Sequence, residues 1–330
     1  MSRTHGDRTK QDEVSLGKGR GEGADSPQEI PARGWLAVTK RAWGEAKEDM
    51  VPLLAAGVAF KAFLAIFPAL TAAFLVWGIF GDPQTISDQI NGISAIPAEA
   101  RDLVLAQVQT VSGQKQSAGI TAVVAILLAL WSASSGVENL MAATNSAYDE
   151  DETRGFVKKK ATALLLTVGA IVFMLLAIAF IGVVPVLVSA LGAGGVVSVV
   201  VNVLRWVLLL ALILVALAVV YRVAPDRDSP KVKWTSVGAG VATVIWLVVS
   251  AGFSLYVTFA GGTSYTKNYG AMAGVVILLM WLWLTSYAIL LGAEVNAESE
   301  KQTDHDTTVG APQPMGQRDA AAADEKPRER

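Results

Sequence analysis

Polar and ionisable side chains stand inside long apolar stretches of this sequence, and these are the residues that could do chemistry. Ammonium, carboxylate and amide groups at such positions can bind ions or polar headgroups, or exchange protons. An ionisable group at membrane depth costs about 2.5–3.5 kcal/mol, so we expect it to face other helices or water rather than lipid. The expected members of this intramembrane polar cluster are Lys61, Ser134, Glu138, Asn139, Asn145, Glu294 and Asn296.

The residue types exclude most catalytic chemistry. The only histidines are His5 and His305, near the two ends of the chain, and there is no cysteine. Histidine bases, thiol nucleophiles and zinc sites inside the apolar stretches are therefore ruled out. A serine–lysine pair between Lys61 and a serine of residues 132–135 stays formally open, although no spacing brings the two together. We expect no enzyme activity, no catalytic residue, no cofactor and no metal site.

The elements that position the polar residues are six apolar stretches in a chain that is 52% hydrophobic, with a mean hydropathy of +0.44. About 20 apolar residues in a helix cross the roughly 30 Å of hydrocarbon in a bilayer. Continuous apolar runs favour helices over the alternating strands of a barrel. Pro68 and Pro185 should kink the first and third helices. The expected spans are Val51–Phe80, Ala118–Ala142, Ala161–Leu191, Val197–Tyr221, Thr235–Ala260 and Ala271–Val295.

Basic residues in the connections set the expected orientation. Lysine and arginine gather at residues 148–160, at residues 222–234 and before the first span, whereas the alternate connections are poor in them. Both termini are therefore expected in the cytoplasm. We expect one membrane domain, residues 34–297, between disordered cytoplasmic tails at residues 1–33 and 298–330, whose polar composition favours disorder.

Two amphipathic segments outside the spans are expected to be helices. Arg33–Asp49 carries Trp35, Val38, Ala42 and Ala46 on one face, a pattern typical of a helix lying in the membrane interface; a short soluble helix is the alternative. Pro97–Val111 should form an external amphipathic helix between the first and second spans.

Small residues four apart mark expected helix contacts. Gly238 and Ala242, Ser236 and Gly240, and Gly270 and Gly274 have this spacing, which lets helix backbones approach closely. Packing within the chain is the favoured use of these stripes, with dimerisation as the alternative.

Helical geometry places the charged members of the cluster. Lys61 lies ten residues past Val51, about 15 Å into the first span. Glu138 and Glu294 each fall about 20 residues along spans that run toward the cytoplasm, so the Lys61 amine should reach toward them. Two alternatives stay open. In the first, Lys61 is a lysine whose ammonium reaches the membrane surface and has no special role. In the second, Glu138 and Glu294 cap the bundle at the lipid headgroups.

Three stretches resemble the YihY/BrkB family of bacterial inner-membrane proteins, formerly mislabelled ribonuclease BN. They are "VPLLAAGVAFKAFLAIFPAL", "LALWSASSGVENLMAATNSAYDEDETRGFVKKK" and "FSLYVTFAGGTSYTKNYGAMAGVVILLMWLWLTSYAILLGAEVNAE", helped by "YRVAPDRDSPKVKW". The resemblance covers about Arg33 to Glu300 and implies six spans with cytoplasmic termini. The family usually has an aromatic residue where this chain has Lys61. Matching positions are Trp131, Ser132, Ser134, Gly136, Asn145, Tyr148, Glu152, Arg154, Tyr269, Gly270, Gly292, Glu294 and Asn296.

The expected class of protein is a polytopic all-α membrane protein in the bacterial plasma membrane. Long kinked spans, interior polar groups and no catalytic cluster favour a transporter or lipid flippase of unknown substrate. The alternative is a membrane scaffold or envelope-assembly protein without transport activity. Membrane lipids are the expected partners, and a second copy or an envelope protein stays open as a further partner. The net charge of −2 argues against nucleic acid, and a ribonuclease would need His and Asp ligands that the spans lack.

Overall fold

The computed structural model describes residues 19–80, 105, 120–190, 192, 195–261 and 272–327. Within these residues the chain is helical, with one isolated bridge between Pro230 and Thr308. The elements are η1 (Pro27–Glu29), α2 (Ala32–Glu48), α3 (Val51–Phe80), α6 (Ile120–Ala147), α7 (Phe156–Ile178), η3 (Ala179–Val183), α8 (Val184–Ala190), α9 (Val196–Val223), α10 (Val232–Tyr256), η4 (Val257–Gly261), α12 (Ala273–Lys301) and α13 (Ala321–Asp324).

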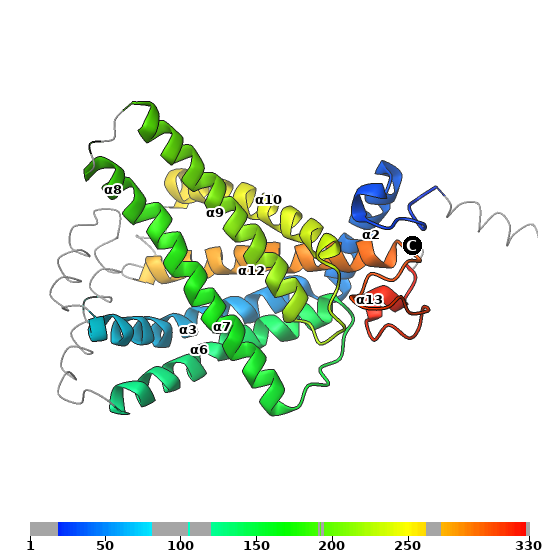
Figure 1. The fold of residues 1–330 in the computed structure, drawn as a ribbon, viewed down its shortest axis with the longest axis horizontal. Helices are drawn as coiled ribbons and strands as arrows, with labels where there is room; N and C mark the ends of the chain where they lie inside the picture. Colours follow the sequence, from blue (N-terminus) through cyan, green and yellow to red (C-terminus); the bar gives the residue numbers. More distant parts are fainter. Residues whose placement is uncertain are drawn as a thin grey trace, which may run out of the picture.

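Six helical segments are long and apolar enough to cross a membrane, so the expected all-α bundle of six spans is confirmed. The segments are α3, α6, the continuous run of α7, η3 and α8, then α9, α10 and α12. Neighbours form a ring in which α3 packs on α6, α6 on α7, α7 on α9, α9 on α10, α10 on α12, and α12 again on α3. Figure 1 shows these helices converging at one end of the molecule and diverging toward the other.

We call the end where the helices converge the polar end. It carries α2, residues 148–155, residues 224–231 and the C-terminal residues 302–327, which lie together in Figure 1. Hydrogen bonds tie these pieces to one another. The Thr153 amide donates to Asp226 Oδ2 over 2.6 Å, and the Lys231 amide donates to the Thr307 carbonyl over 2.8 Å.

The third span contains a wide π-helical turn, η3, which ends two residues before Pro185. A proline inside an α-helix removes one hydrogen bond, and its ring crowds the carbonyl four residues earlier, here that of Ile181. Widening the helix by one residue per turn relieves that crowding. The first span behaves differently, because α3 runs without a break through Pro68.

A close helix contact joins α10 and α12 at two glycines. A Cβ atom added to Gly238 would collide with the Gly292 carbonyl, and one added to Gly292 would collide with the Tyr221 hydroxyl and the Gly238 carbonyl. The stripe of Gly238 and Ala242 is therefore used inside the chain, as the close-approach rule predicts. A Cβ at Gly240 meets open space, and so does one at Gly274, whose stripe partner Gly270 lies outside the described residues.

The helix expected at Arg33–Asp49 is present as α2, but its expected membrane face packs on protein. Val38 and Ala42 are buried against Val295 of α12, with Val237 and Val241 of α10 close by. The hydrophobic pattern was real, but a neighbouring helix covers it in place of lipid. The external helix expected at Pro97–Val111 falls, apart from Leu105, outside the described residues.

The terminal segments differ from the expected tails wherever the structure describes them. Residues 302–327 fold back onto the polar end, and Thr303, Thr307 and Arg318 are buried there. The Arg318 guanidinium donates to the carbonyls of Ala323 and Asp304. Ala24 and Ile30 are likewise buried against Trp234. Composition missed this order because hydrogen bonds to backbone carbonyls and small buried residues hold the segment, rather than a large apolar core.

Candidate functional site

Helix α12 divides into two parts with different surroundings. From Leu290 to Thr303 every residue is buried, whereas from Val275 to Thr285 every residue is partly exposed and none is fully buried. A helix at the rim of a bundle buries one face and exposes the other, so buried and exposed positions alternate along its sequence. The uniform partial exposure of Val275–Thr285 shows that neighbours flank this part of α12 without closing around it. We call the bundle around Val275–Thr285 the open half.

Lys61 stands on α3 and is partly exposed. No hydrogen bond or ion pair joins its ammonium to another described residue. Its backbone carbonyl lies against Gly136 of α6, where an added Cβ would sit 3.3 Å from the oxygen. The position is thus fixed by close packing of α3 on α6, while the charge itself is left without a protein partner among the described residues.

Glu138 pairs with a lysine other than Lys61. Its Oε1 lies 2.9 Å from Nζ of Lys160 on α7. The same ammonium donates to the Trp131 carbonyl over 3.2 Å and lies 4.3 Å from the centre of the Trp131 ring. The buried Lys160 is therefore fully supplied with partners, and this group staples α6 to α7.

The amide side chains of the expected cluster make structural contacts. Asn145 accepts from the Asp226 amide over 2.8 Å and donates to Glu152 over 3.3 Å. Asn296 accepts from the Gly238 amide over 2.6 Å and donates to the Thr235 carbonyl over 3.3 Å, which joins α12 to α10.

The remaining uncharged members bond to their own helix. The Ser134 hydroxyl donates to the Trp131 carbonyl, and the Asn139 amide donates to the Ser135 carbonyl. The expected cluster is thus distributed over several separate groups, not gathered at one point.

Glu294 is almost fully buried and lies beside Asp49, which ends α2. Burial and the nearby charge of Asp149 raise the pKa of Asp49 to about 6, while the neighbouring Glu294 carboxyl and the charge of Lys301 act in the opposite direction. Within the described residues, Glu294 Oε1 has no hydrogen-bond partner.

The strongest charge pair of the polar end was not singled out from the sequence. Arg227 and Glu300 are both fully buried, with Nη2 and Oε2 2.7 Å apart. Thr307 donates to the same carboxylate oxygen over 2.6 Å, and the Arg227 guanidinium lies 5.1 Å from the centre of the Tyr148 ring. Burial alone would lower the pKa of Arg227, but the charge and hydrogen bonds of Glu300 raise it. Arg227 lies in the "APDRDSP" stretch, and that location was the available signal.

Further ion pairs surround the C-terminal part of α12 at the polar end. Arg41 of α2 meets Glu298 at 2.6 Å, and Lys301 meets both Asp149 at 2.7 Å and Glu298 at 3.1 Å. Buried charges are tolerated when each has a partner, which is the case for all of these. The polar end is therefore a closed network of charges.

Tryptophan side chains hold α12 in the open half. The Trp246 indole donates to the Thr285 hydroxyl over 3.2 Å, and the Trp283 indole donates to the Pro52 carbonyl over 2.9 Å. Trp246 and Trp281 also meet edge to face, with ring centres 6.3 Å apart. Apart from these few hydrogen bonds, residues 275–284 are apolar.

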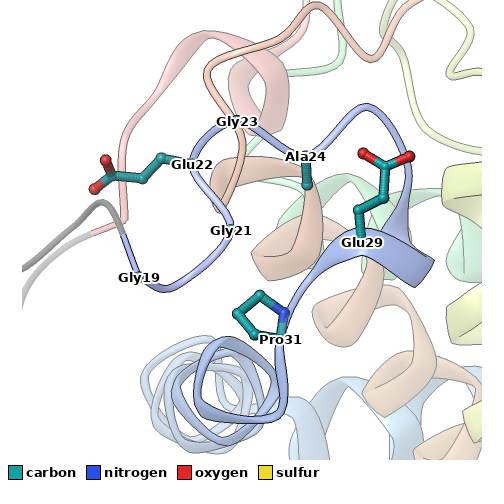
Figure 2. A pocket seen from close by; sticks show the side chains of 7 residues that line it. All are labelled: Gly19, Gly21, Glu22, Gly23, Ala24, Glu29 and Pro31. Carbon is teal, nitrogen blue, oxygen red and sulfur yellow. The ribbon is translucent and has the colours of Figure 1, made fainter.

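A pocket of about 390 Å³ lies outside the bundle, in the loop before α2. Figure 2 shows it lined by Gly19, Gly21, Glu22, Gly23, Ala24, Glu29 and Pro31, with the Glu22 carboxylate turned away from the loop. The Glu29 carboxylate accepts from the Asp25 amide and the Ser26 hydroxyl, so it serves the loop itself. In the part of the chain that the structure describes, no group of His, Asp or Glu side chains could hold a metal ion.

Fold and site together define a polytopic membrane protein with a charge-paired end and an apolar, half-open opposite end. Residues 42–316 match the family model described as "Virulence factor BrkB", and the chain belongs to this BrkB/YihY family.

Relatives from three bacteria match parts of this chain. "Putative ribonuclease-like protein YfkH" of Bacillus subtilis is 33% identical over 183 residues, which are 54% of this chain and 65% of the relative. A "UPF0761 membrane protein" of Alteromonas mediterranea is 42% identical over 81 residues, 24% of this chain and 26% of the relative. Another, of Citrobacter koseri, is 29% identical over 272 residues, 80% of this chain and 88% of the relative. In the first two matches the chain spans less than two thirds of the relative. No solved structure matches.

Proposed function

We propose that this protein is a lipid flippase or related transporter that moves amphipathic molecules through the open half of its bundle. The observation that supports this most is the uniform partial exposure of Val275–Thr285 inside a ring of six helices. The lining is apolar with a few indole and hydroxyl groups. Such a surface suits acyl chains, whereas a hydrophilic solute would need a largely polar lining.

The ammonium of Lys61, which has no partner among the described residues, adds to this proposal. A cation at mid-span is costly without a partner, and an anionic headgroup would supply one. The wide turn η3 interrupts the third span, and the second π-helical turn, η4, follows α10 at the end of the fifth span; such turns often occur at functional sites. Together they give the bundle a charge for a headgroup and helices able to adjust.

The test is a scrambling assay in proteoliposomes that carry a fluorescent phospholipid, with dithionite added outside. Wild-type protein should expose the inner-leaflet pool to the quencher, and Leu278→Trp in the open half should slow that at least tenfold. Val248→Trp on α10, whose side chain is 67% exposed, introduces the same indole on an exposed face and should leave the rate unchanged. Equal rates in empty and protein-containing vesicles would contradict the proposal, as would equal effects of the two variants.

We also propose that the polar end faces the cytoplasm of a bacterium whose inner membrane holds the chain. The basic residues of the connections support this orientation. Because the chain has no cysteine, a single introduced cysteine reports its own side of the membrane. Ala311→Cys at the polar end should react with an impermeant maleimide only after cell lysis, whereas Val196→Cys at the start of α9 should react in intact cells.

A membrane scaffold is the second candidate, and the closed charge network of the polar end supports it. A scaffold would leave scrambling at the level of empty vesicles and lose its partners when the polar end is disrupted. A ribonuclease is not proposed. That word belongs to the printed name of the Bacillus relative, and the spans of this chain hold no histidine.

A further inference from the structure

A stripe of basic and apolar side chains runs along the outer face of α2. Its members on α2 are spaced three or four residues apart, which places them on one face of the helix, and one further apolar residue, Met50, follows the end of α2. Leu36, Trp43 and Met50 are 74%, 52% and 60% exposed. The basic members between them are exposed as well. We define the α2 stripe as Arg33, Leu36, Lys40, Trp43, Lys47 and Met50.

The packing of α2 determines where this stripe points. The opposite face, with Val38 and Ala42, is buried against Val237 and Val241 of α10 and Val295 of α12. Val237 and Val241 lie in the first turns of a membrane span. The helix therefore leans against the flank of the bundle at the depth where the spans begin, and the stripe points away from the bundle.

Continuity with α3 fixes the same depth independently. Only Asp49 and Met50 separate the end of α2 from Val51, where the first span starts. A segment this close to the start of a span lies at the headgroup layer of the bilayer. In Figure 1, α2 sits at the polar end and is not aligned with the six spans.

The charges of the stripe suit an anionic surface. It holds three basic residues and no acidic one, and Lys47 Nζ lies 5.6 Å from the centre of the Trp43 ring. Arg41, by contrast, is turned toward the protein and is paired with Glu298. Cations alternating with Leu, Trp and Met are typical of helices whose basic groups meet phosphates while their apolar groups enter the acyl boundary.

We propose that the α2 stripe binds the headgroups of anionic phospholipids in the membrane around the polar end. The bound lipids anchor the flank of the bundle where α2 covers α10 and α12. This site is separate from the open half, and it does not depend on lipid transport.

The first measurement compares lipid retention by the purified full-length chain from mixed vesicles of phosphatidylglycerol and phosphatidylcholine. Wild-type protein should retain phosphatidylglycerol preferentially. Lys40→Gln combined with Lys47→Gln should reduce that preference about fivefold for each charge removed. The control, Lys326→Gln, removes one exposed charge from the C-terminal segment, outside α2, and should change little. An equal loss of preference for each charge removed in the two variants would overturn the proposal.

The second measurement uses spin labels at Leu36→Cys and Trp43→Cys in nanodiscs containing phosphatidylglycerol. Both labels should be accessible to oxygen and shielded from a water-soluble nickel reagent, whereas a label at Ala311→Cys should show the reverse. Labels at 36 and 43 as water-accessible as the one at 311 would refute the assignment. Dipolar coupling between labels on separate chains would refute it too, because the stripe would then contact a second copy.

Discussion

The two ends of α12 differ in burial and in the interactions that hold them. Toward the polar end the helix is enclosed, and its charged residues Glu298, Glu300 and Lys301 are buried with partners. In the open half the same helix is apolar and only partly covered. Within one helix, the charged part is therefore held by specific partners, whereas the apolar part is less completely covered by its neighbours. Paired charges hold the polar end, while apolar contacts hold the open half.

The largest test of this comparison removes one partner of the buried pair. Glu300→Ala removes the carboxylate that is hydrogen-bonded to the buried Arg227 and leaves only Glu150, 4.0 Å away, as an acidic neighbour; it should destabilise the protein by about 3–5 kcal/mol. Thermal unfolding in detergent measures the loss. Lys326→Ala breaks an exposed pair with Asp304 and should cost at most about 1 kcal/mol. Similar losses from the two variants would show that the polar end is not held by its buried charges.

Two leucines on the same helix sharpen the comparison. Leu290 is fully buried, so Leu290→Ala should cost about 2–5 kcal/mol through the cavity that it leaves. Leu279 is partly exposed in the open half, and Leu279→Ala should cost about 1 kcal/mol or less. The same unfolding assay compares the two variants directly. A loss at Leu279 as large as the loss at Leu290 would mean that the open half is as well packed as the polar end.

The glycine contact gives a smaller effect of known geometry. Gly292→Ala places a methyl group against the Tyr221 hydroxyl and the Gly238 carbonyl, and we expect a loss of about 1–3 kcal/mol. Gly240→Ala on α10 meets open space and should be neutral or stabilise the helix by up to about 1 kcal/mol. Opposite signs for the two substitutions are the expected result, and equal signs would contradict the assigned crossing point.

The smallest effect concerns pH. Burial raises the pKa of Glu150 from its usual 4.5 to about 7, although Glu150 accepts a hydrogen bond from the Ala321 amide and lies near Arg227. The folded state thus holds this proton more tightly than the unfolded state does, so stability falls as pH rises from about 4.5 to 7. After allowance for solvent screening, the change should be about 1–2 kcal/mol.

A fluorescent probe at Ala311→Cys should therefore become more mobile in the C-terminal segment as pH rises through this range. Adding Glu150→Gln should flatten the response, because the side chain then stays neutral. A pH response that survives this substitution would assign the effect to another group, with Asp49 the next to examine.

Run length and composition were sufficient to predict the six spans, because burial in lipid demands long apolar helices with few alternatives. The partners of the polar residues were not predictable in the same way. Glu138 pairs with Lys160, not with Lys61, because α7 brings Lys160 across the α6 surface, and no one-dimensional pattern encodes that approach. The covered face of α2 shows the same limit, since a hydrophobic stripe suits a neighbouring helix as well as a lipid.

The crossing of α10 and α12 at Gly238 and Gly292 also determines how far each end of α12 would move if the helix rotated about this point. Gly292 lies close to the polar end, and the helix continues from it to Ala273, about 28 Å away at 1.5 Å per residue. Asn296 is hydrogen-bonded to α10 beside this crossing. A rotation of α12 by about 10° about Gly292 would move Ala273 by about 5 Å, roughly the width of an acyl chain. The same rotation would move Glu300, about 12 Å beyond Gly292, by about 2 Å, so the distant end of α12 moves more than twice as far as the charged end.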